Sequence, residues 1–171
     1  MTIKLHIGGI EKKEDWKILN LSKLNIVDYI GDIGDLTMFD DGSCEAVYAS
    51  HVLEHVPQAK VINTLKGINR ILIPGGKFYI SVPDLDILCK LFINPVISIQ
   101  EKFHIMRIIY GGQIDSNDFH YFGWNLEFMA YFLKEAGFFK IERKDSLGLF
   151  NDTSECEIHG VKISLNLIAS K

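Results

Sequence analysis

The sequence predicts an α/β fold built on a mostly parallel sheet. Short β-prone segments alternate with amphipathic helical patterns along most of the 171 residues, as in parallel sheets with crossover helices. The last two β-prone segments, 138–144 and 161–169, have no helical pattern between them, which favours an antiparallel edge. Polar residues follow several predicted strands directly, where such sheets bind ligands. We expect one domain over residues 1–171.

Composition and charge narrow the classes of function. Hydrophobic residues make up 47% of the chain, which is enough for a folded core. The net charge is −4 and the basic residues are scattered, which argues against a nucleic-acid partner. The sequence has no apolar run long enough to span a membrane, and its N-terminus lacks the pattern of a signal peptide. Three widely separated cysteines fit a reducing compartment, so we expect a cytoplasmic protein without a membrane partner.

The first two predicted strands are unusually close in sequence. Residues 3–7 alternate apolar and polar side chains and end at Gly8-Gly9, a pair that allows a turn and a close approach of backbone to ligand. The next β-prone segment, 16–21, begins after a gap of only six residues. A parallel crossover that contains a helix needs about a dozen residues. Either the connection is abbreviated or the second segment is not a central strand.

The stretch 44–57, Cys-Glu-Ala-Val-Tyr-Ala-Ser-His-Val-Leu-Glu-His-Val-Pro, is where we expect the site to form. Residues 46–49 predict a strand, and Ser50 is a good N-cap for one or two helical turns over 51–56. Pro57 limits that helix. The pattern predicts that Ser50 and His51 lie at the carboxyl edge of the sheet. Asp32 follows a third predicted strand at 25–30, so we expect it at the same edge.

The rest of the chain continues the alternation. The pattern predicts a strand at 77–82 and helices at 59–72, 85–92, 95–110 and 125–135. Between the last two helices, residues 111–124 carry many rings and acids, among them Asp115, Asp118 and His120. These groups are candidates for an acceptor site, and His120 is the best candidate base because a neutral imidazole takes a proton near pH 7. The alternative is that they only cap the following helix.

Six motifs taken together resemble the class I S-adenosylmethionine-dependent methyltransferases. Within that family the chain is similar to small bacterial methyltransferase-domain proteins that carry the Ser-His-Val-Leu-Glu-His signature, and the resemblance covers nearly the whole chain. The motifs are Leu5-His6-Ile7-Gly8-Gly9, Asp40-Asp41-Gly42-Ser43, Tyr48-Ala49-Ser50-His51-Val52-Leu53-Glu54-His55-Val56, Arg70-Ile71-Leu72-Ile73-Pro74-Gly75-Gly76-Lys77, Val82-Pro83-Asp84 and Glu135-Ala136-Gly137-Phe138.

The resemblance implies a Rossmann-like seven-stranded sheet of order 3-2-1-4-5-7-6 with strand 7 antiparallel. It also implies S-adenosylmethionine bound across the carboxyl ends of the first strands. The implied cofactor-binding set is His6, Gly8, Gly9, Asn20, Asp32, Ile33, Ser50 and His51, with Asn20 at the ribose hydroxyls and Asp32 near the adenine amine. The alternation within 3–7 also makes His6 a candidate core residue.

Two departures from the family pattern point to weaker cofactor binding. The glycine loop lacks its third glycine and most of the following helix, whose N-terminus would help to hold the cofactor's carboxylate. Asn20 stands where the family has an acid, so a bond to a hydroxyl there would lack the strength that a charge gives.

His51-Val-Leu-Glu54-His55 also matches the H-x-x-E-H pattern of inverted zinc peptidases. We expect no metal there, because Pro57 cuts the helix short and the sequence shows no evident third ligand. A structural role for Glu54 and His55, which would hold neighbouring backbone, is the main alternative to a ligand-site role.

The expected function is methyl transfer from S-adenosylmethionine to a small-molecule or sugar-linked acceptor. His51 or His120 would be the base, and Asp118 or Asp115 would contact the acceptor. The alternative is a non-catalytic binding or assembly module with a degenerate cofactor site. The sequence leaves open whether the protein forms a homodimer.

Overall fold

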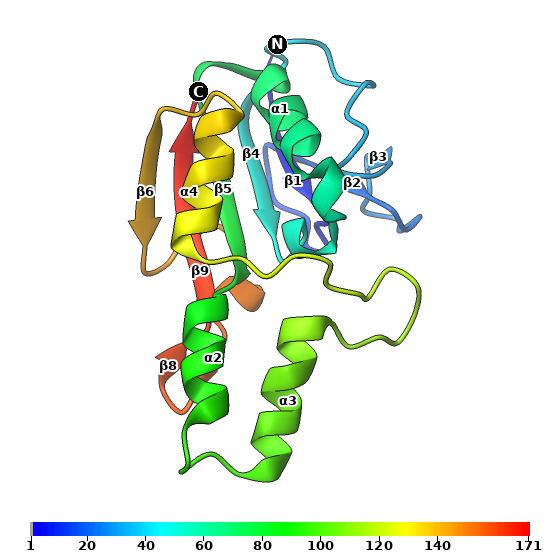
Figure 1. Cartoon of the computed structure of the whole chain (residues 1–171). Helices are drawn as coiled ribbons and strands as arrows, with labels where there is room; N and C mark the ends of the chain where they lie inside the picture. The colour runs from blue at the N-terminus through cyan, green and yellow to red at the C-terminus, as the bar shows by residue number, and fades with distance from the viewer. Residues whose placement is uncertain (1) are drawn as a thin grey trace.

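A seven-stranded sheet forms the centre of the structure, a computed structural model that describes residues 2–171 (Figure 1). Its strands are β1 (Ile3–Ile7), β2 (Trp16–Asn20), β3 (Tyr29–Ile30), β4 (Cys44–Ser50), β5 (Leu72–Pro83), β6 (Lys140–Lys144) and β9 (Ser164–Ser170). Their order is β3-β2-β1-β4-β5-β9-β6, and β9 runs antiparallel to both of its neighbours. The predicted order is therefore confirmed, with β9 as the expected seventh strand. A small hairpin, β7 (Glu157–Ile158) and β8 (Val161–Lys162), precedes β9.

The connection between β1 and β2 contains no helix. The two strands nevertheless pair in parallel, from Lys4 opposite Trp16 to Ile7 opposite Leu19. The abbreviated connection is thus the correct one of the two sequence alternatives, and β2 is a central strand. The third strand is shorter than predicted, since only Tyr29–Ile30 of residues 25–30 pair with β2.

Helices α1 (Val61–Ile71) and α4 (Leu126–Glu135) cover one face of the sheet (Figure 1). Leu65 and Ile68 of α1 and Leu133 of α4 are fully buried in the main core with the apolar residues of β1, β4 and β5. The spacing of these residues on one side of each helix explains both helices, because only that side is covered by the sheet. Asn125 caps α4 by accepting a hydrogen bond from the Phe128 amide at 2.9 Å.

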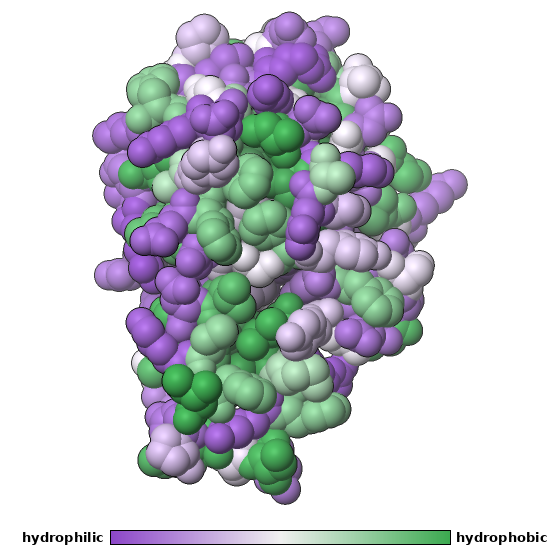
Figure 2. Space-filling view, in the orientation of Figure 1, coloured by the Kyte–Doolittle hydropathy of each residue, from purple (hydrophilic) through white to green (hydrophobic). Residues whose placement is uncertain are grey.

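Helices α2 (Leu85–Ile93) and α3 (Ile99–Tyr110) pack together beyond the carboxyl end of β5 (Figure 1). A separate small core that includes Leu88, Leu91 and Ile105 joins them. Figure 2 shows hydrophobic side chains gathered on the lower part of this face, over the two helices. The exposed ones include Phe92, Ile93, Val96, Ile99 and Phe103. No helix within residues 2–171 is long and apolar enough to cross a membrane.

The opposite face of the sheet is covered by a loop, residues 145–155. The step from β1 to β2 runs in the opposite direction along the sheet to the step from β4 to β5. A right-handed connection after β1 would therefore lie on the face opposite α1. There Phe150 packs against His6, Trp16 and Tyr48, and the Tyr48 hydroxyl donates to Asp152 at 2.7 Å. The loop takes the place of the missing helix.

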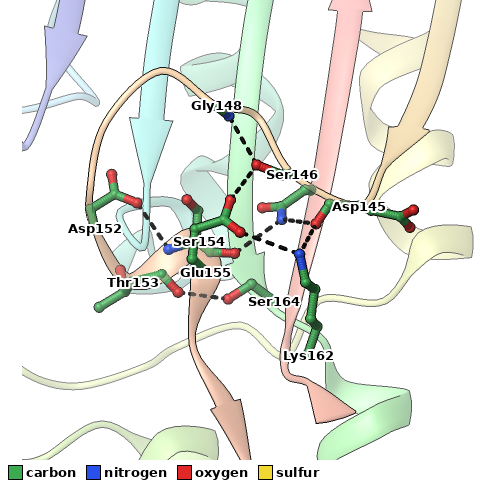
Figure 3. A network of polar contacts seen from close by, with 10 residues as sticks. Asp145, Ser146, Gly148, Asp152, Thr153, Ser154, Glu155, Lys162 and Ser164 are labelled. Atoms are coloured by element: carbon green, nitrogen blue, oxygen red, sulfur yellow. Dashed lines mark hydrogen bonds and ion pairs between the residues drawn. The ribbon is translucent and has the colours of Figure 1, made fainter. Parts of the chain in front are cut away.

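A polar network holds this loop on β9 (Figure 3). The Asn166 amide donates to the carbonyl of Ser154 at 3.0 Å, and the Ser164 hydroxyl donates to the carbonyl of Thr153 at 3.0 Å. Lys162 donates to the carbonyl of Asp145 at 2.9 Å and lies 3.3 Å from the Glu155 carboxylate. The ordered loop therefore depends on side chains that the last strands present.

The predicted N-cap role of Ser50 is wrong, and the helix predicted at 51–56 is reduced to one 3-10 turn. Strand β4 continues through Ser50, which pairs with Ser81, and the His51 amide donates to the Ser81 carbonyl at 2.8 Å. Extended pairing thus uses residues expected in the helix, and only a 3-10 turn, Leu53–His55, fits before Pro57. Other boundaries differ as well. β5 begins at Leu72 rather than Lys77, α3 begins at Ile99 because Ser98 forms a capping box with Glu101, and the segment predicted as one strand at 161–169 is divided between β8 and β9.

Candidate functional site

A pocket of about 430 Å³ opens at the carboxyl ends of β1, β2 and β4. Six of the predicted site residues line it, namely Gly8, Asn20, Asp32, Ile33, Ser50 and His51. They come from four segments that are far apart in sequence. The parallel arrangement brings these segments together because it places the carboxyl ends of neighbouring strands at one edge of the sheet.

Gly8 forms the floor between β1 and the segment after β4. Its φ of +78° lies in the left-handed region, and its amide donates to the Leu19 carbonyl at 2.8 Å. A Cβ there would lie 2.6 Å from Cγ2 of Val52, so a larger residue would collide with the neighbouring loop. Gly9 does not line the pocket; a Cβ at Gly9 would meet the His6 ring at 2.7 Å.

Asn20 ties the shortened connection to β2. Its Nδ2 donates to the Gly9 carbonyl at 3.1 Å, and its Oδ1 accepts from the Ser22 amide at 2.9 Å. An aspartate could not make the first bond, because an ionised carboxylate has no hydrogen to donate. The amide therefore suits a glycine loop that has no helix to hold it.

Asp32 is exposed at the pocket. Its Oδ1 accepts from the Gly34 amide at 2.6 Å, which fixes the carboxylate in a tight turn and leaves its second oxygen able to accept from a ligand. Ile33 beside it is 6% exposed and belongs to the main core, so it anchors the turn that presents Asp32.

His51 is held by hydrogen bonds in a strained backbone conformation. Its φ is +52°, which is uncommon for a residue other than glycine. Its Nε2 lies 3.0 Å from the Ser164 hydroxyl oxygen, and that hydroxyl donates its hydrogen to Thr153. The Nε2 hydrogen is therefore donated to Ser164, and the lone pair lies on Nδ1. The preceding residue, Ser50, has a buried hydroxyl without a partner among residues 2–171.

The pKa of His51 does not suit a strong base. Burial lowers this pKa to about 4, and the charge of Asp152 offsets the effect only in part. A general base works best when its pKa is near the working pH. The imidazole is therefore neutral at pH 7 and takes a proton poorly, and its catalytic role stays a prediction.

Glu54 is the most unusual group near the pocket. Its side chain is 1% exposed, and neither carboxylate oxygen has a hydrogen-bond partner among residues 2–171. Burial raises its pKa to about 8. Its main-chain carbonyl accepts from the amides of Tyr121 at 2.8 Å and Phe122 at 3.2 Å. The backbone of Glu54 therefore has the structural role expected from the sequence, but its side chain has no such partner.

His55 and His120 lie beside Glu54. One ligand atom from each of the three side chains lies within 4.8 Å of the others. The two imidazole rings meet edge to face, with centroids 4.7 Å apart, and His55 Nδ1 lies 3.1 Å from the Phe119 carbonyl. The sequence motif around Glu54 showed no third ligand, and His120 now supplies a candidate.

Five predicted site residues lie outside the pocket lining: His6, Gly9, Asp115, Asp118 and His120. His6 is 5% exposed on the face covered by the loop, and burial lowers its pKa to about 4. Its position favours the core role that the alternation indicated. Asp118 accepts from the Ile114 amide at 3.3 Å and so shapes its own loop. The roles assigned to these residues stay predictions.

Several lining residues were missed by the sequence analysis. Lys60 lies within the predicted helix 59–72, and Ser116, Asn117 and Tyr121 lie in the segment 111–124, where only Asp115, Asp118 and His120 were named as candidates. Hydrogen bonds from the backbone amides of Tyr121 and Phe122 to the Glu54 carbonyl bring this segment to the pocket. Such long-range pairing has no signal in local periodicity.

Comparisons with known proteins agree with the fold. Residues 12–80 match the family model of a methyltransferase domain, and no curated protein matches the chain by sequence. The structure is similar to a SAM-dependent methyltransferase from Archaeoglobus fulgidus, with a TM-score of 0.63, 15% identity, and coverage of 99% of this chain and 86% of that one.

Two further solved structures share the fold. A SAM-dependent methyltransferase from Thermotoga maritima has a TM-score of 0.56 and 15% identity, over 100% of this chain and 83% of that one. Human N-acetylserotonin methyltransferase, in complex with SAM, has a TM-score of 0.58 and 14% identity, over 99% of this chain and 47% of that one. Residues 12–80 therefore match a methyltransferase-domain model, and the whole chain shares the fold of these solved methyltransferases.

Proposed function

We propose that the protein transfers the methyl group of S-adenosylmethionine to a small-molecule or sugar-linked acceptor. One observation carries the proposal: a pocket of about 430 Å³ at the carboxyl edge of a methyltransferase-type sheet collects six residues expected at a cofactor site. The names of the solved relatives from Archaeoglobus fulgidus and Thermotoga maritima give the same cofactor, and the human relative is in complex with it.

The residues of the pocket fit this cofactor. The volume lies within the range of about 300 to 1,000 Å³ that is usual for small-molecule sites. Apolar side chains of Ile7, Leu19 and Val52 offer a wall for a flat ring, and the second Asp32 oxygen can accept from an amine or hydroxyl. Gly8 has no side chain between its backbone and the pocket.

The cofactor supplies a methyl group that is already activated by its sulfonium sulfur, so the protein has to align the reactants and exclude water. His51 is fixed through Ser164, and the buried hydroxyl of Ser50 beside it has no partner of its own. On the side of segment 111–124, Asn117 and Tyr121 line the pocket with polar groups that an acceptor can contact.

A non-catalytic binding module is the second candidate. The low pKa of His51 favours it, because this imidazole is a weak base. The bond from Asn20 to Gly9 argues against a decayed cofactor site, since it supports the shortened loop directly. The two candidates differ in one result: a binding module holds the cofactor or another ligand but yields no S-adenosylhomocysteine with any acceptor.

Calorimetric titration with S-adenosylmethionine and S-adenosylhomocysteine tests the proposal. We expect micromolar binding of both, and Asp32→Asn should weaken it by about tenfold, the loss typical of one hydrogen bond to a charged group. Asp35→Asn is the matched control, because Asp35 is also exposed and in a turn but does not line the pocket. Absence of binding at millimolar ligand would reject the cofactor. Binding that is unaffected by Asp32→Asn would place the cofactor elsewhere.

A further inference from the structure

Glu54, His55 and His120 form a cluster of side chains that can bind a metal ion. A carboxylate that is 1% exposed normally has a hydrogen-bond or ion-pair partner, because burying a charge without one is costly. Both oxygens of Glu54 lack a hydrogen-bond partner among residues 2–171, and no lysine or arginine of that range pairs with it. Its nearest ionisable neighbour, Nδ1 of His51, lies 3.5 Å from Oε1.

The hydrogen bonds of the two neighbouring imidazoles, His51 and His55, leave one nitrogen lone pair free on each ring. Nε2 of His51 is occupied by Ser164, so Nδ1 of His51 faces Glu54 without a hydrogen. Nδ1 of His55 donates to the Phe119 carbonyl at 3.1 Å, which leaves Nε2 as its free lone pair. A carbonyl that orients a histidine in this way is the usual outer partner of a metal ligand. The cluster therefore holds several atoms that can bind a metal ion and that no hydrogen bond occupies.

From this arrangement we propose that Glu54, His55 and His120 bind a divalent transition-metal ion. One carboxylate and two imidazoles form a common three-residue ligand set, which leaves a coordination position open. Ligand atoms about 2.1 Å from a shared ion lie roughly 3 to 3.5 Å apart. The three groups, now within 4.8 Å of one another, need only small side-chain movements to reach that geometry.

We expected no metal because the helix before Pro57 is short and the sequence shows no third ligand. The helix is indeed short, but the structure supplies a third ligand. The 3-10 turn Leu53–His55 brings Glu54 and His55 together. Hydrogen bonds from the backbone amides of Tyr121 and Phe122 to the Glu54 carbonyl bring His120 to the same place. Because His55 also lines the pocket, an ion here would lie at its wall, open to an oxygen atom of an acceptor. Only this last point rests on the proposed methyl transfer.

Zinc titration of the full chain tests the site. The protein is first treated with a chelator, and it carries Cys89→Ser and Cys156→Ser so that neither exposed thiol competes for the ion. We expect one Zn²⁺ per chain. Loss of a residue that only orients a metal ligand lowers affinity by about 10–100-fold. Glu54→Gln and His120→Gln remove ligands themselves, so each should weaken Zn²⁺ binding by more than that. Mg²⁺ should bind far more weakly than Zn²⁺, because it prefers oxygen ligands.

His104→Gln is the matched control, since His104 is an exposed histidine on α3 outside the cluster, and it should bind Zn²⁺ like the parent. Circular dichroism of the metal-free variants checks that they fold. Glu54→Gln should fold, because glutamine has nearly the same shape as glutamate. The visible absorption of bound Co²⁺ gives a second readout, which both ligand substitutions should change. Absence of Zn²⁺ binding at millimolar concentration, or unchanged binding in both ligand variants, would overturn the proposal. These titrations need no S-adenosylmethionine, so they are judged separately from methyl transfer.

Discussion

Two buried histidines of the sheet region, His6 and His51, are neutral at pH 7. His6 and His51 both have a pKa of about 4, and in each case burial is the main cause. A histidine in the unfolded chain takes up its proton near pH 6.5. Each buried histidine therefore links the stability of the fold to pH, whatever role it has in the site.

His6 should make the protein less stable as the pH falls. Between pH 6.5 and 4 the unfolded chain binds a proton that the folded chain does not, so stability is full above 6.5 and falls toward 4. The loss amounts to up to about 3 kcal/mol. Urea unfolding of His6→Gln between pH 7.5 and 4.5 should show a shallower fall than the parent, whereas His104→Gln should keep the parent's fall. Equal slopes for His6→Gln and the parent would contradict this account.

Asn20→Asp should weaken cofactor binding, although it restores the acid of the family pattern. The carboxylate would face the Gly9 carbonyl that the amide now bonds at 3.1 Å, and two acceptors would repel each other. We expect at least about a fivefold loss of affinity for S-adenosylhomocysteine by calorimetry, consistent with one lost hydrogen bond. Asn117→Asp, which also adds a charge to the pocket wall, should have a smaller effect. A gain in affinity for Asn20→Asp would show that the amide is a decayed acid.

At the scale of elements, the alternation of strand and helix patterns was enough to predict a mostly parallel sheet, and the family resemblance supplied its strand order. The alternation failed where partners distant in sequence decide the conformation. The His51 amide donates a hydrogen bond to the Ser81 carbonyl, which extends β4. The Gly75 amide donates to the Lys171 carbonyl at 2.8 Å, which extends β5 toward its N-terminal end. Neither partner can be read from local periodicity. The site followed the same rule: residues directly after strands were found, whereas Ser164 and Tyr121 were not.

Helix α1 carries a glycine that the fold does not need. A Cβ at Gly67 would lie 3.8 Å from Cδ1 of Leu36, an ordinary contact, and its φ is not in the left-handed region. Gly67→Ala should therefore raise stability by about 0.5 to 1 kcal/mol, because glycine is a poor residue in the middle of a helix. The midpoint of urea unfolding measures it. Gly8→Ala is the contrasting variant, and it should destabilise; a loss of stability in Gly67→Ala as well would mean that α1 has no room for the methyl group.

At the scale of the whole molecule, the two faces of the sheet are covered by different means. Helices cover one face, and the loop 145–155 covers the other over Trp16 and Tyr48. Phe150, at 7% exposure, is the main apolar side chain that the loop contributes. The stability of the N-terminal strands should therefore depend on a residue that is far away in sequence.

Phe150→Ala should destabilise the protein by about 3 to 5 kcal/mol, the usual cost of removing a buried phenylalanine. Urea unfolding followed by tryptophan fluorescence measures it, because Trp16 packs on this ring at 5.3 Å. Phe139→Ala, at a phenylalanine that is 73% exposed, should cost little. If both variants unfold at the same urea concentration, the loop does not contribute to the core.

The covering loop also has a consequence for synthesis on the ribosome. β1, β2 and β4 emerge well before Phe150 and before β9, which fits between β5 and β6. Until then the nascent chain exposes Trp16 and Tyr48 and lacks a strand inside its sheet. The N-terminal half therefore cannot complete its core until Phe150 and β9 have emerged, and its aromatic surface is open to non-native contacts until then.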